Sequence, residues 1–512
     1  MTAADTSTLP VANRGIITVS VMLATVMQAL DTTIANVALP HVQGALSATK
    51  DEMGWVLTSY IVAAAITIPL TGSLANFIGR RRVFLWSIVL FTIASLLCGA
   101  AQSLPQIVFF RFLQGVGGAA LVPLSQAVLF DINQPKDFGR VMAIWVGCVQ
   151  GGNIFGPALG GWLTEDYSWR WVFYINLPVG VLAFSGLLLT LPETPKRTGS
   201  RFDIFGFAAL SLAVAGLQLL LDRGQLLDWF SSPEIITEAV VAGLAFYLFI
   251  VHTLTSRDPF LNPALFIDTN FVISSLFVFL IGVVVFATLA LLPPMLQEQL
   301  RYPVVLTGLV TAPRGIGTLA GMVVTGRLIG KVDIRLLLII GLLLTAYSLW
   351  QMTQYSLLMG YGPVVVSGLL QGIGVALIYL PISTSAFLTL PVALRNEGTA
   401  FFNLSRNIGS SIGISVVLFT LTQNTQRLTA SIGEHITAYN MAANPAAIAA
   451  HADVGTGGGL AALAASIGDQ AAMIAYIDDF KLMMIATLLT LPFVLFLRSA
   501  KTRAADHLVV IE

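Results

Sequence analysis

Two charged residues lie inside long apolar segments of this sequence and are the first candidates for chemistry. Asp31 lies about seven residues from one end of segment 15–38, and Arg111 lies about five residues inside segment 106–128. At 1.5 Å per residue, both side chains would lie roughly 8–10 Å below the same membrane surface. Ionisable residues at that depth are functional candidates by default. Burial disfavours a charged carboxylate and a nearby guanidinium favours it, so the pair predicts coupled proton binding. A static structural ion pair is the alternative.

Three further polar residues are candidates for contact with a substrate or a coupling ion. Arg406 lies about eight residues into segment 398–421, at a depth of roughly 12 Å from the opposite surface, and Asn403 precedes it by one turn. An arginine there predicts binding of an anionic group or a carboxylate, and snorkelling to the surface is the alternative. Glu298 follows the ninth apolar segment, where solvation at the interface is the simpler interpretation. Arg314 gives a weaker signal than these.

A stripe of small residues marks another apolar segment. Gly152, Gly156 and Gly160 recur every four residues, followed by Gly161. Such a stripe lets two helix backbones approach closely in lipid. Pro157 removes a backbone donor and permits a bend. The segment therefore predicts a bendable helix that rocks against a neighbour, with ordinary tight packing as the alternative.

A short loop between the second and third apolar segments combines glycines with arginines. It contains Gly72, Asn76, Gly79, Arg80 and Arg81. Part of this positive charge reflects the general preference of Lys and Arg for the inner loops of membrane proteins. The close glycines predict a tight turn whose guanidinium groups hold neighbouring helix C-termini. We favour a conformational latch over a contact with substrate.

These residues must be positioned by membrane-spanning helices. Apolar runs of roughly 17–25 residues are candidates for such helices. Fourteen are predicted, at about 15–38, 54–75, 82–101, 106–128, 137–161, 171–191, 203–221, 235–254, 271–292, 305–328, 334–353, 362–385, 398–421 and 480–497. With both termini inside, the inner loops and tails hold sixteen of the 26 Lys and Arg residues and the outer loops hold five. This asymmetry follows the positive-inside rule.

Composition supports this all-α, polytopic membrane class. The 512 residues are 56% hydrophobic and only 10% charged, whereas soluble domains carry about 25% charge. The zero net charge argues against a nucleic-acid partner. Cys98 and Cys148 both lie in apolar segments, so no disulfide framework or metal site is predicted. No phosphate-binding loop or nucleophile motif is present in the sequence, which argues against an enzyme and for a gradient as the energy source, without a cofactor.

An internal repeat divides the chain. Residues 112–117 (FLQGVG) reappear as 369–374 (LLQGIG), 257 positions later, and another pair of segments matches at an offset of 254. Eight spans separate the copies, so the two halves have the same orientation, as in transporters with parallel repeats. The second copy has no charge at the matching places: Gly368 matches Arg111, and an apolar stretch near Ala287 matches Asp31.

The repeat predicts three parts. Residues 1–200 form an N-terminal six-helix bundle, 201–256 two inserted transmembrane helices, and 257–512 a C-terminal six-helix bundle with a long outer loop at about 422–478. The composition of that loop predicts partly helical or mobile structure, and its histidines, His435 and His451, are expected to be solvated.

Together these motifs resemble the major facilitator superfamily, and within it the fourteen-span drug:proton antiporters of the EmrB/QacA type. Residues 72–81 resemble the loop 2–3 motif, although Asn76 stands where the family usually has Asp. Arg111, Gln114 and Gly115 resemble the fourth-span motif linked to proton transfer. Residues 152–161 resemble the antiporter motif. Residues 30–40 resemble the first-span signature of the group, and 221–232 resemble its EmrB branch.

The resemblance implies proton-coupled efflux of hydrophobic or amphipathic compounds across a bacterial inner membrane, by a multi-pass protein in contact with lipid. It also implies a periplasmic adaptor of the EmrA type and an outer-membrane channel as partners. A single-metabolite exporter or importer of the same fold is the alternative function. A scaffold without transport is disfavoured, because it has no need for charges in lipid.

Overall fold

Every apolar segment of the sequence forms a helix in the computed structural model, which describes residues 13–134, 137–193, 202–391, 394–435 and 457–497. Within these ranges the only extended pairing is the isolated bridge between Ile329 and Val332. The α-helices are α1 (Arg14–Leu46), α2 (Lys50–Ile78), α3 (Arg80–Ala100), α4 (Leu104–Gly118), α5 (Leu121–Ile132), α6 (Phe138–Asp166), α7 (Trp171–Tyr174), α8 (Asn176–Thr190), α9 (Ile204–Arg223), α10 (Pro233–Thr255), α11 (Thr269–Pro294), α12 (Val304–Leu328), α13 (Ile334–Met352), α14 (Gly362–Leu388), α15 (Arg395–Glu434) and α18 (Gly457–Leu489).

Twelve helical stretches in the described residues are long and apolar enough to cross a membrane. The other two predicted spans fall on α6, of 29 residues, and α12, of 25 residues. Each of the fourteen predicted segments thus coincides with a helix, while the number of membrane crossings stays a prediction.

Helix ends follow local sequence signals. Thr49 and Glu52 form a capping box at the start of α2, in which each side chain accepts a hydrogen bond from the other residue's backbone N–H, and so satisfies donors that the first turn leaves free. The carboxylate of Asp268 accepts hydrogen bonds from the backbone N–H groups of Asn270 and Phe271 and so caps the start of α11. Gly79 separates α2 from α3 with a φ of +104°, a conformation that favours glycine.

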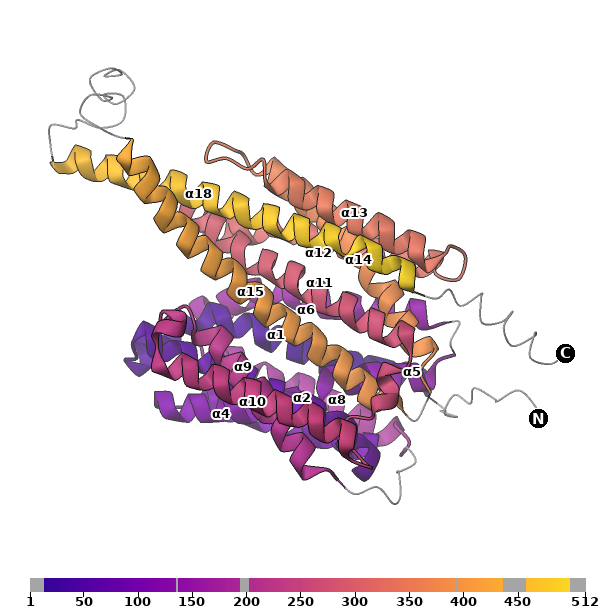
Figure 1. The fold of residues 1–512 in the computed structure, drawn as a ribbon. Helices are drawn as coiled ribbons and strands as arrows, with labels where there is room; N and C mark the ends of the chain where they lie inside the picture. The colour runs from indigo at the N-terminus through magenta and orange to yellow at the C-terminus, as the bar shows by residue number, and fades with distance from the viewer. Residues whose placement is uncertain (1–12, 135–136, 194–201, 392–393, 436–456, 498–512) are drawn as a thin grey trace.

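The outer loop is shorter than the sequence predicts. Helix α15 continues to Glu434 and α18 begins at Gly457, so residues 422–434 and 457–478 of the predicted loop are helical. The two helices contact each other, and together they reach beyond the remaining helices at one end of the molecule and diverge toward the other end (Figure 1). A search for continuous apolar runs misses these extensions because Thr, Gln, Ala and Gly dominate them.

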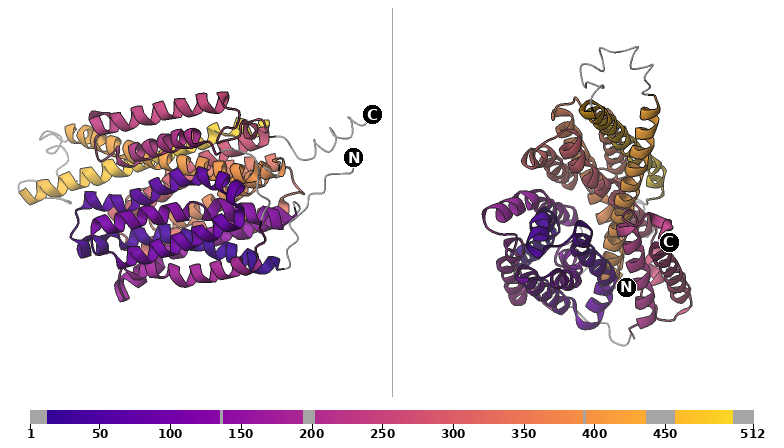
Figure 2. Two further views of the ribbon diagram at one scale, coloured as in Figure 1. Left: turned by 90° about the horizontal axis from the view of Figure 1, so that it is seen from below. Right: turned by 90° about the vertical axis from the view of Figure 1, so that its left-hand side faces the viewer.

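Three groups of helices are visible when the molecule is viewed along its helices (Figure 2, right). Helices α1–α8 form one group, and α11–α18 form another. The pair α9 and α10 lies beside α2 and α15, at the junction of these two groups. The start of α1 and the end of α18 lie at the end of the molecule where the two chain termini are marked (Figure 1), which we call the inner end.

Contacts inside the two groups repeat with the spacing seen in the sequence. Gly115 of α4 packs on the backbone of Tyr60 in α2, and Gly372 of α14 packs on the backbone of Arg314 in α12. The glycines are 257 positions apart and their partners 254 apart. Close backbone packing at glycine therefore fixes the same pair of helices in both halves.

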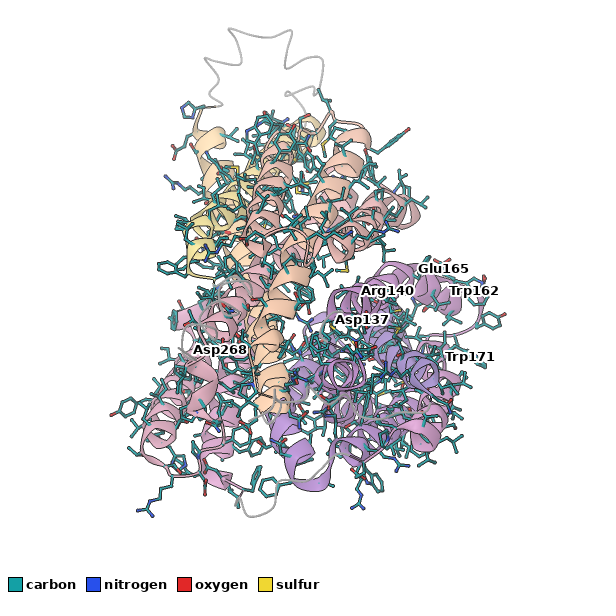
Figure 3. All side chains as sticks on the ribbon, turned by 90° about the vertical axis from the view of Figure 1, so that its right-hand side faces the viewer. Asp137, Arg140, Trp162, Glu165, Trp171 and Asp268 are labelled. Carbon is teal, nitrogen blue, oxygen red and sulfur yellow. The ribbon has the colours of Figure 1, made fainter. Side chains whose placement is uncertain are left out.

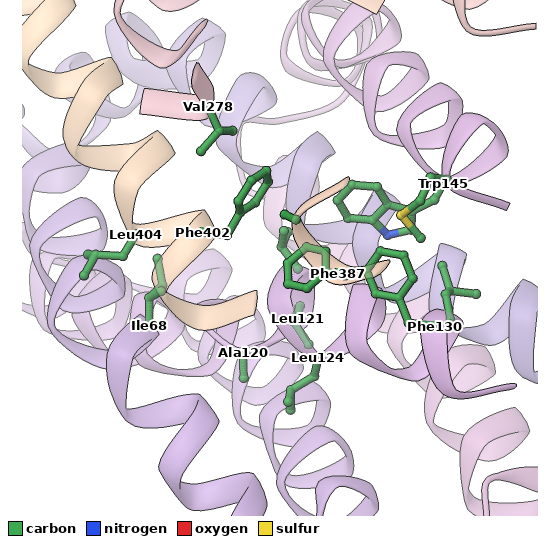
Figure 4. Close-up of a cluster of buried hydrophobic side chains, with 14 of the residues drawn as sticks. Ile68, Ala120, Leu121, Leu124, Phe130, Trp145, Val278, Phe387, Phe402 and Leu404 are labelled. Atoms are coloured by element: carbon green, nitrogen blue, oxygen red, sulfur yellow. The ribbon is translucent and has the colours of Figure 1, made fainter. Parts of the chain in front are cut away.

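The two halves contact each other near the inner end. Phe130 of α5 packs against Phe387 of α14, with ring centroids 4.9 Å apart, and Phe387 packs against Phe402 of α15 at 5.5 Å. Figure 4 shows these rings with Trp145 of α6 in one buried cluster. Burial of aromatic side chains supplies much of the stability of such contacts.

A second contact between the halves joins α6 and α12, also near the inner end. A Cβ on Gly139 would lie 3.5 Å from Ile329, and one on Gly147 would lie 3.0 Å from Leu319. Towards the outer end of the same helix, Phe155 is 68% exposed. In Figure 3 the inner end of α6, marked by Arg140, lies nearer the middle of the molecule than its outer end, marked by Trp162. The structure is therefore closed at the inner end.

Candidate functional site

The predicted pair Asp31 and Arg111 forms a buried ion pair between α1 and α4. Arg111 Nη1 donates to Asp31 Oδ2 at 2.7 Å, and both residues are 1% exposed. The guanidinium also donates through Nε to the carbonyl of Val56 in α2 at 3.3 Å. Two charges removed from water are tolerated only when their remaining hydrogen-bonding groups are satisfied, and here the neighbouring helices satisfy them.

Two amides complete the environment of the carboxylate. Gln114 Nε2 donates to Asp31 Oδ1 at 2.7 Å, and its Oε1 accepts from Arg111 at 2.9 Å. Asn176 Nδ2, at the start of α8, donates to the same Oδ1 at 3.0 Å. Gln114 was a candidate from the sequence and lies where the motif predicts, whereas Asn176 was missed. A single neutral amide in an apolar segment gives a weaker signal than a charge.

The hydrogen bonds extend through Ser95 of α3. Asn176 Nδ2 also donates to Ser95 Oγ at 2.9 Å, and this hydroxyl donates to the carbonyl of Phe173 at 2.8 Å. One carboxylate thus connects α1 with α3, α4 and α8. Arg111, Gln114 and Asn176 together donate three hydrogen bonds to its two oxygens. Addition of a proton to Asp31 would weaken all of these connections together.

An aromatic ring covers the ion pair. The Arg111 guanidinium lies over the ring of Tyr60, with its central carbon 4.4 Å from the centroid. Cation–π contacts of this kind stabilise a desolvated cation. Tyr60 in turn accepts a hydrogen bond from Gln28 Nε2 at 3.2 Å. The ring therefore shields the pair and connects it to a polar residue one turn below Asp31.

The glycine stripe of α6 packs on α1 beside Asp31. A Cβ on Gly152 would lie 3.0 Å from Ala29, one on Gly156 would overlap Thr33 Oγ1, and one on Gly160 would lie 2.9 Å from Ile34. These partners flank Asp31 in sequence. Gly161 lies off this face, with open space around its Cβ position, and α6 remains helical through Pro157. The predicted contact face thus lies against the helix that carries the carboxylate.

The predicted latch residues join the two halves at the inner end. Asn76 Nδ2 donates to Glu397 Oε1 at 3.1 Å, and Asn396 Nδ2 donates to Asn76 Oδ1 at 2.6 Å. Gly72 lets α2 approach the backbone of Asn396, which a Cβ would reach at 2.9 Å. The family usually has Asp where this chain has Asn76. In this structure Glu397 of α15 already supplies a carboxylate at that place, which gives a physical reason for the amide.

The arginines of the latch have different partners. Arg80 forms a buried ion pair with Asp131 of α5 and donates to Asn396 Oδ1. Arg81 donates to the carbonyl of Leu188 at 2.6 Å, which is near the end of α8. A Cβ on Gly79 would overlap the carboxylate of Glu193. The predicted short loop is thus reduced to Gly79, because α2 runs to Ile78 and α3 begins at Arg80. The adjoining helix ends contact both an acidic residue of their own half and helix α15 of the other half.

The remaining candidates lie apart from Asp31. Asn403 is 1% exposed and donates to Gln126 Oε1 of α5 at 2.7 Å, across the contact between the halves. Arg406 is half-buried one turn away, and no ion pair of its side chain is present among the described residues. Glu298 is exposed in the π-helical turn Met295–Gln299. These three residues do not form one site.

Two buried carboxylates escaped prediction, Glu397 at the inner contact and Asp479 in α18. Asp479 of α18 is 1% exposed and bonds to Thr420 of α15 at 2.5 Å. It lies just outside the segment that the sequence assigns to the last span, because that span was placed at 480–497. A longer helix prediction would have identified it as a charge inside the bundle.

Comparison with known proteins agrees with the geometry. The family model described as Major Facilitator Superfamily matches residues 21–414. The chain is 37% identical to the multidrug export protein EmrB of Escherichia coli (strain K12) over 427 residues, 83% of each chain. It is also 37% identical to the fatty acid resistance protein FarB of Neisseria gonorrhoeae over 428 residues, 83% of this chain and 84% of FarB. The solved structure of the proton:xylose symporter XylE superposes with a TM-score of 0.59 at 16% identity, covering 94% of this chain and 95% of XylE.

Proposed function

Because this chain belongs to the major facilitator superfamily, we propose that it exports hydrophobic or amphipathic compounds across a bacterial inner membrane in exchange for protons. Relatives at 37% identity are named for multidrug export and for fatty acid resistance. Members of the superfamily are transporters rather than enzymes. The energy source that we propose is the proton gradient.

The observation that carries the proposal is the buried carboxylate of Asp31 beside the glycine stripe of α6. A charged Asp31 holds α1 against α3, α4 and α8 through its hydrogen bonds. A proton on Asp31 removes one charge of the ion pair and leaves Arg111 as an unpaired buried cation, which is strongly unfavourable. Helices around α1 then rearrange, and the stripe at Gly152–Gly160 is the surface on which α1 and α6 slide.

The latch gives this local change a wider effect. The structure is closed at the inner end by Asn76 with Glu397 and by the aromatic cluster around Phe387. We propose that this state accepts a proton at Asp31 from the outer side, and that the protonated protein opens the inner end to bind its substrate. Release of the proton inside then favours closure and substrate export. Ligands shift such equilibria only through different affinities for the two states.

We also propose an adaptor protein and an outer-membrane channel as partners. The support is the EmrB-type relationship and the extension of α15 and α18 beyond the other helices (Figure 1). Pull-down of the full chain from cross-linked bacterial membranes, compared with a variant lacking residues 425–465, tests this. Loss of a periplasmic partner from the truncated variant alone supports the proposal. An unchanged set of partners contradicts it.

The decisive experiment measures substrate-driven proton movement in proteoliposomes, with wild type beside Asp31→Asn. Proton release with several unrelated amphipathic drugs, abolished in the variant, is the expected result. Release that survives Asp31→Asn would move the proton site elsewhere. Release with one metabolite only would replace multidrug export by a narrow-range transporter.

A further inference from the structure

We propose that the C-terminal half contains a binding site for the carboxylate of an amphipathic anion, built around Arg314. The proposal rests on the export function proposed above and names a class of its substrates. The site lies between α11, α12 and α14. It corresponds in position to the Asp31 site of the N-terminal half but lacks the acid.

The first observation is a buried guanidinium without an acidic partner. Arg314 is 9% exposed, and its Nη2 donates to the carbonyl of Val285 in α11 at 3.1 Å. Its Nη1 is buried and has no hydrogen-bond partner, and no carboxylate among the described residues forms an ion pair with it. A buried charge left without a counter-charge is costly. An incoming anion would relieve that cost.

The internal repeat shows what is missing. Gln114 donates to Asp31, and at the matching place Gln371 Nε2 donates to Thr288 Oγ1 at 3.2 Å. Thr288 lies 257 positions after Asp31, so a hydroxyl replaces the carboxylate. The sequence placed an apolar stretch near Ala287 there, one residue away from the polar side chain that makes the contact.

The arginine is also exchanged between helices. Gly368 matches Arg111, and Arg314 lies 254 positions after Tyr60, the residue whose ring covers Arg111. A Cβ on Gly368 would lie 3.5 Å from Arg314 Cβ. The second half therefore keeps the amide on the matching helix α14, takes its guanidinium from α12 instead, and has a hydroxyl in place of the acid at this position.

A second cation lies on the other flank of α11. Gly282 packs on the backbone of Arg406, and Val285, the partner of Arg314, follows Gly282 by three residues, or about one turn. Arg406 Nε is buried without a partner. Since Arg406 follows Asn403 by three residues, it shares the helix face that contacts the N-terminal half. Arg314 and Arg406, neither of which has an ion pair among the described residues, therefore contact α11 within about one helical turn of each other.

These observations favour an anionic ligand over a cationic or neutral one. A carboxylate accepts two parallel hydrogen bonds from a guanidinium, and the free Nη1 of Arg314 supplies a donor. The ligand's carboxylate would take the role that Asp31 has in the first half, with its apolar tail among the surrounding helices.

The test compares ligands with one tail and different heads. Binding of decanoate and of decyltrimethylammonium is measured by titration with radiolabelled ligand on the full chain in nanodiscs, with empty nanodiscs subtracted. Wild type, Arg314→Gln, Arg314→Lys and Arg406→Gln are compared. The matched control is Arg335→Gln, since Arg335 also donates to a carbonyl, that of Leu497, but at the inner end.

Arg314→Gln should weaken decanoate binding roughly 10- to 100-fold, the effect of a lost hydrogen bond to a charged group, and leave the cation unaffected. Arg314→Lys should recover part of the loss, and Arg335→Gln should have no effect. Equal losses for both ligands, or no loss of decanoate binding, would overturn the anion site.

Transport of the same ligands separates this proposal from the export function. Export of the cation by wild type without binding of decanoate contradicts the anion site and leaves the exporter in place. Binding of decanoate that depends on Arg314, without export of any amphiphile from proteoliposomes, keeps the site and contradicts the export function.

Discussion

Asp31 and Arg111 are each surrounded by partners from other helices, so neither can be removed without consequence for the other. Asp31→Asn and Arg111→Gln should each lower the free energy of unfolding by about 3–5 kcal/mol, because each leaves an unpaired buried charge. The double variant Asp31→Asn/Arg111→Gln should recover much of this loss and still fail in proton-coupled transport. Thermal unfolding in detergent and proton release in proteoliposomes measure the two properties. A double variant that transports like wild type would make the pair purely structural.

Asn76 offers a second test at the scale of single residues. Asn76→Asp should place a carboxylate against Glu397 and weaken the inner contact, because like charges repel at hydrogen-bonding distance. Glu397→Gln in the same chain should restore the contact. Spin labels at Arg140 and Lys331, near the contact of α6 with α12, report the distance by electron resonance. A longer distance in Asn76→Asp alone is expected, and an unchanged distribution would show that Asn76 does not hold the latch.

Charges were the part of the site that the sequence could predict. Asp31 and Arg111 stand out in apolar segments, and their similar depths predicted that they meet. Asn176 and Ser95 gave no comparable signal, since neutral polar residues are common in membrane helices. The sequence gives only a weak indication that Arg314 is functional, for a different reason. Its importance depends on the absence of an acid nearby, which only the packed structure shows.

At the scale of elements, the contact of α1 with α6 depends on single missing side chains. Gly156→Ala should push Thr33 away and separate the helices next to Asp31, at a cost of roughly 1–3 kcal/mol for overpacking. Gly161→Ala is the matched control on the same helix, because no atom lies within 4 Å of its Cβ position. Unfolding temperature and drug export should fall in the first variant and not in the second. If both variants behave alike, the stripe has no special role at Gly156.

Helix positions were predictable from hydropathy, and helix ends were not. All fourteen apolar segments coincide with helices, but the segment 106–128 is divided between α4 and α5, after the glycines at 117 and 118. Helix α15 has 40 residues where the sequence suggested 24 (398–421). A window of apolar residues detects what lies in lipid, whereas α15 and α18 stabilise their outer ends by packing on each other.

At the scale of the whole molecule, the repeat has produced two unlike halves. The N-terminal half holds Asp31 with Arg111, whereas at the matching place the C-terminal half holds Thr288, near Arg314, which has no ion pair among the described residues. Had both halves kept the same site, a proton and an anionic substrate would compete for equivalent positions. In the mechanism that we propose, their separation would let the two ligands bind in different halves of one fold, so that each could bias the same inner contact.

Helix α15 connects events on the two sides of the membrane. At 1.5 Å per residue its 40 residues span about 60 Å, roughly twice the hydrocarbon thickness of a bilayer. Its first residues, Asn396 and Glu397, belong to the inner latch. Spin labels at Ala430 and Gln106, with Cys98 and Cys148 replaced by serine, should show a distance change in Asn76→Asp. A distance that stays fixed while the inner contact opens would mean that α15 bends.

Helix α15 is held at its inner end by the contacts of Asn396 and Glu397 with Asn76, so a rotation about that end is amplified along the helix. A small tilt at the inner latch moves the outer tip of α15 and α18 by a larger distance, well above the lipid headgroups. The position of the tip would then report, on the outer side of the membrane, whether the opposite end of the transporter is open or closed.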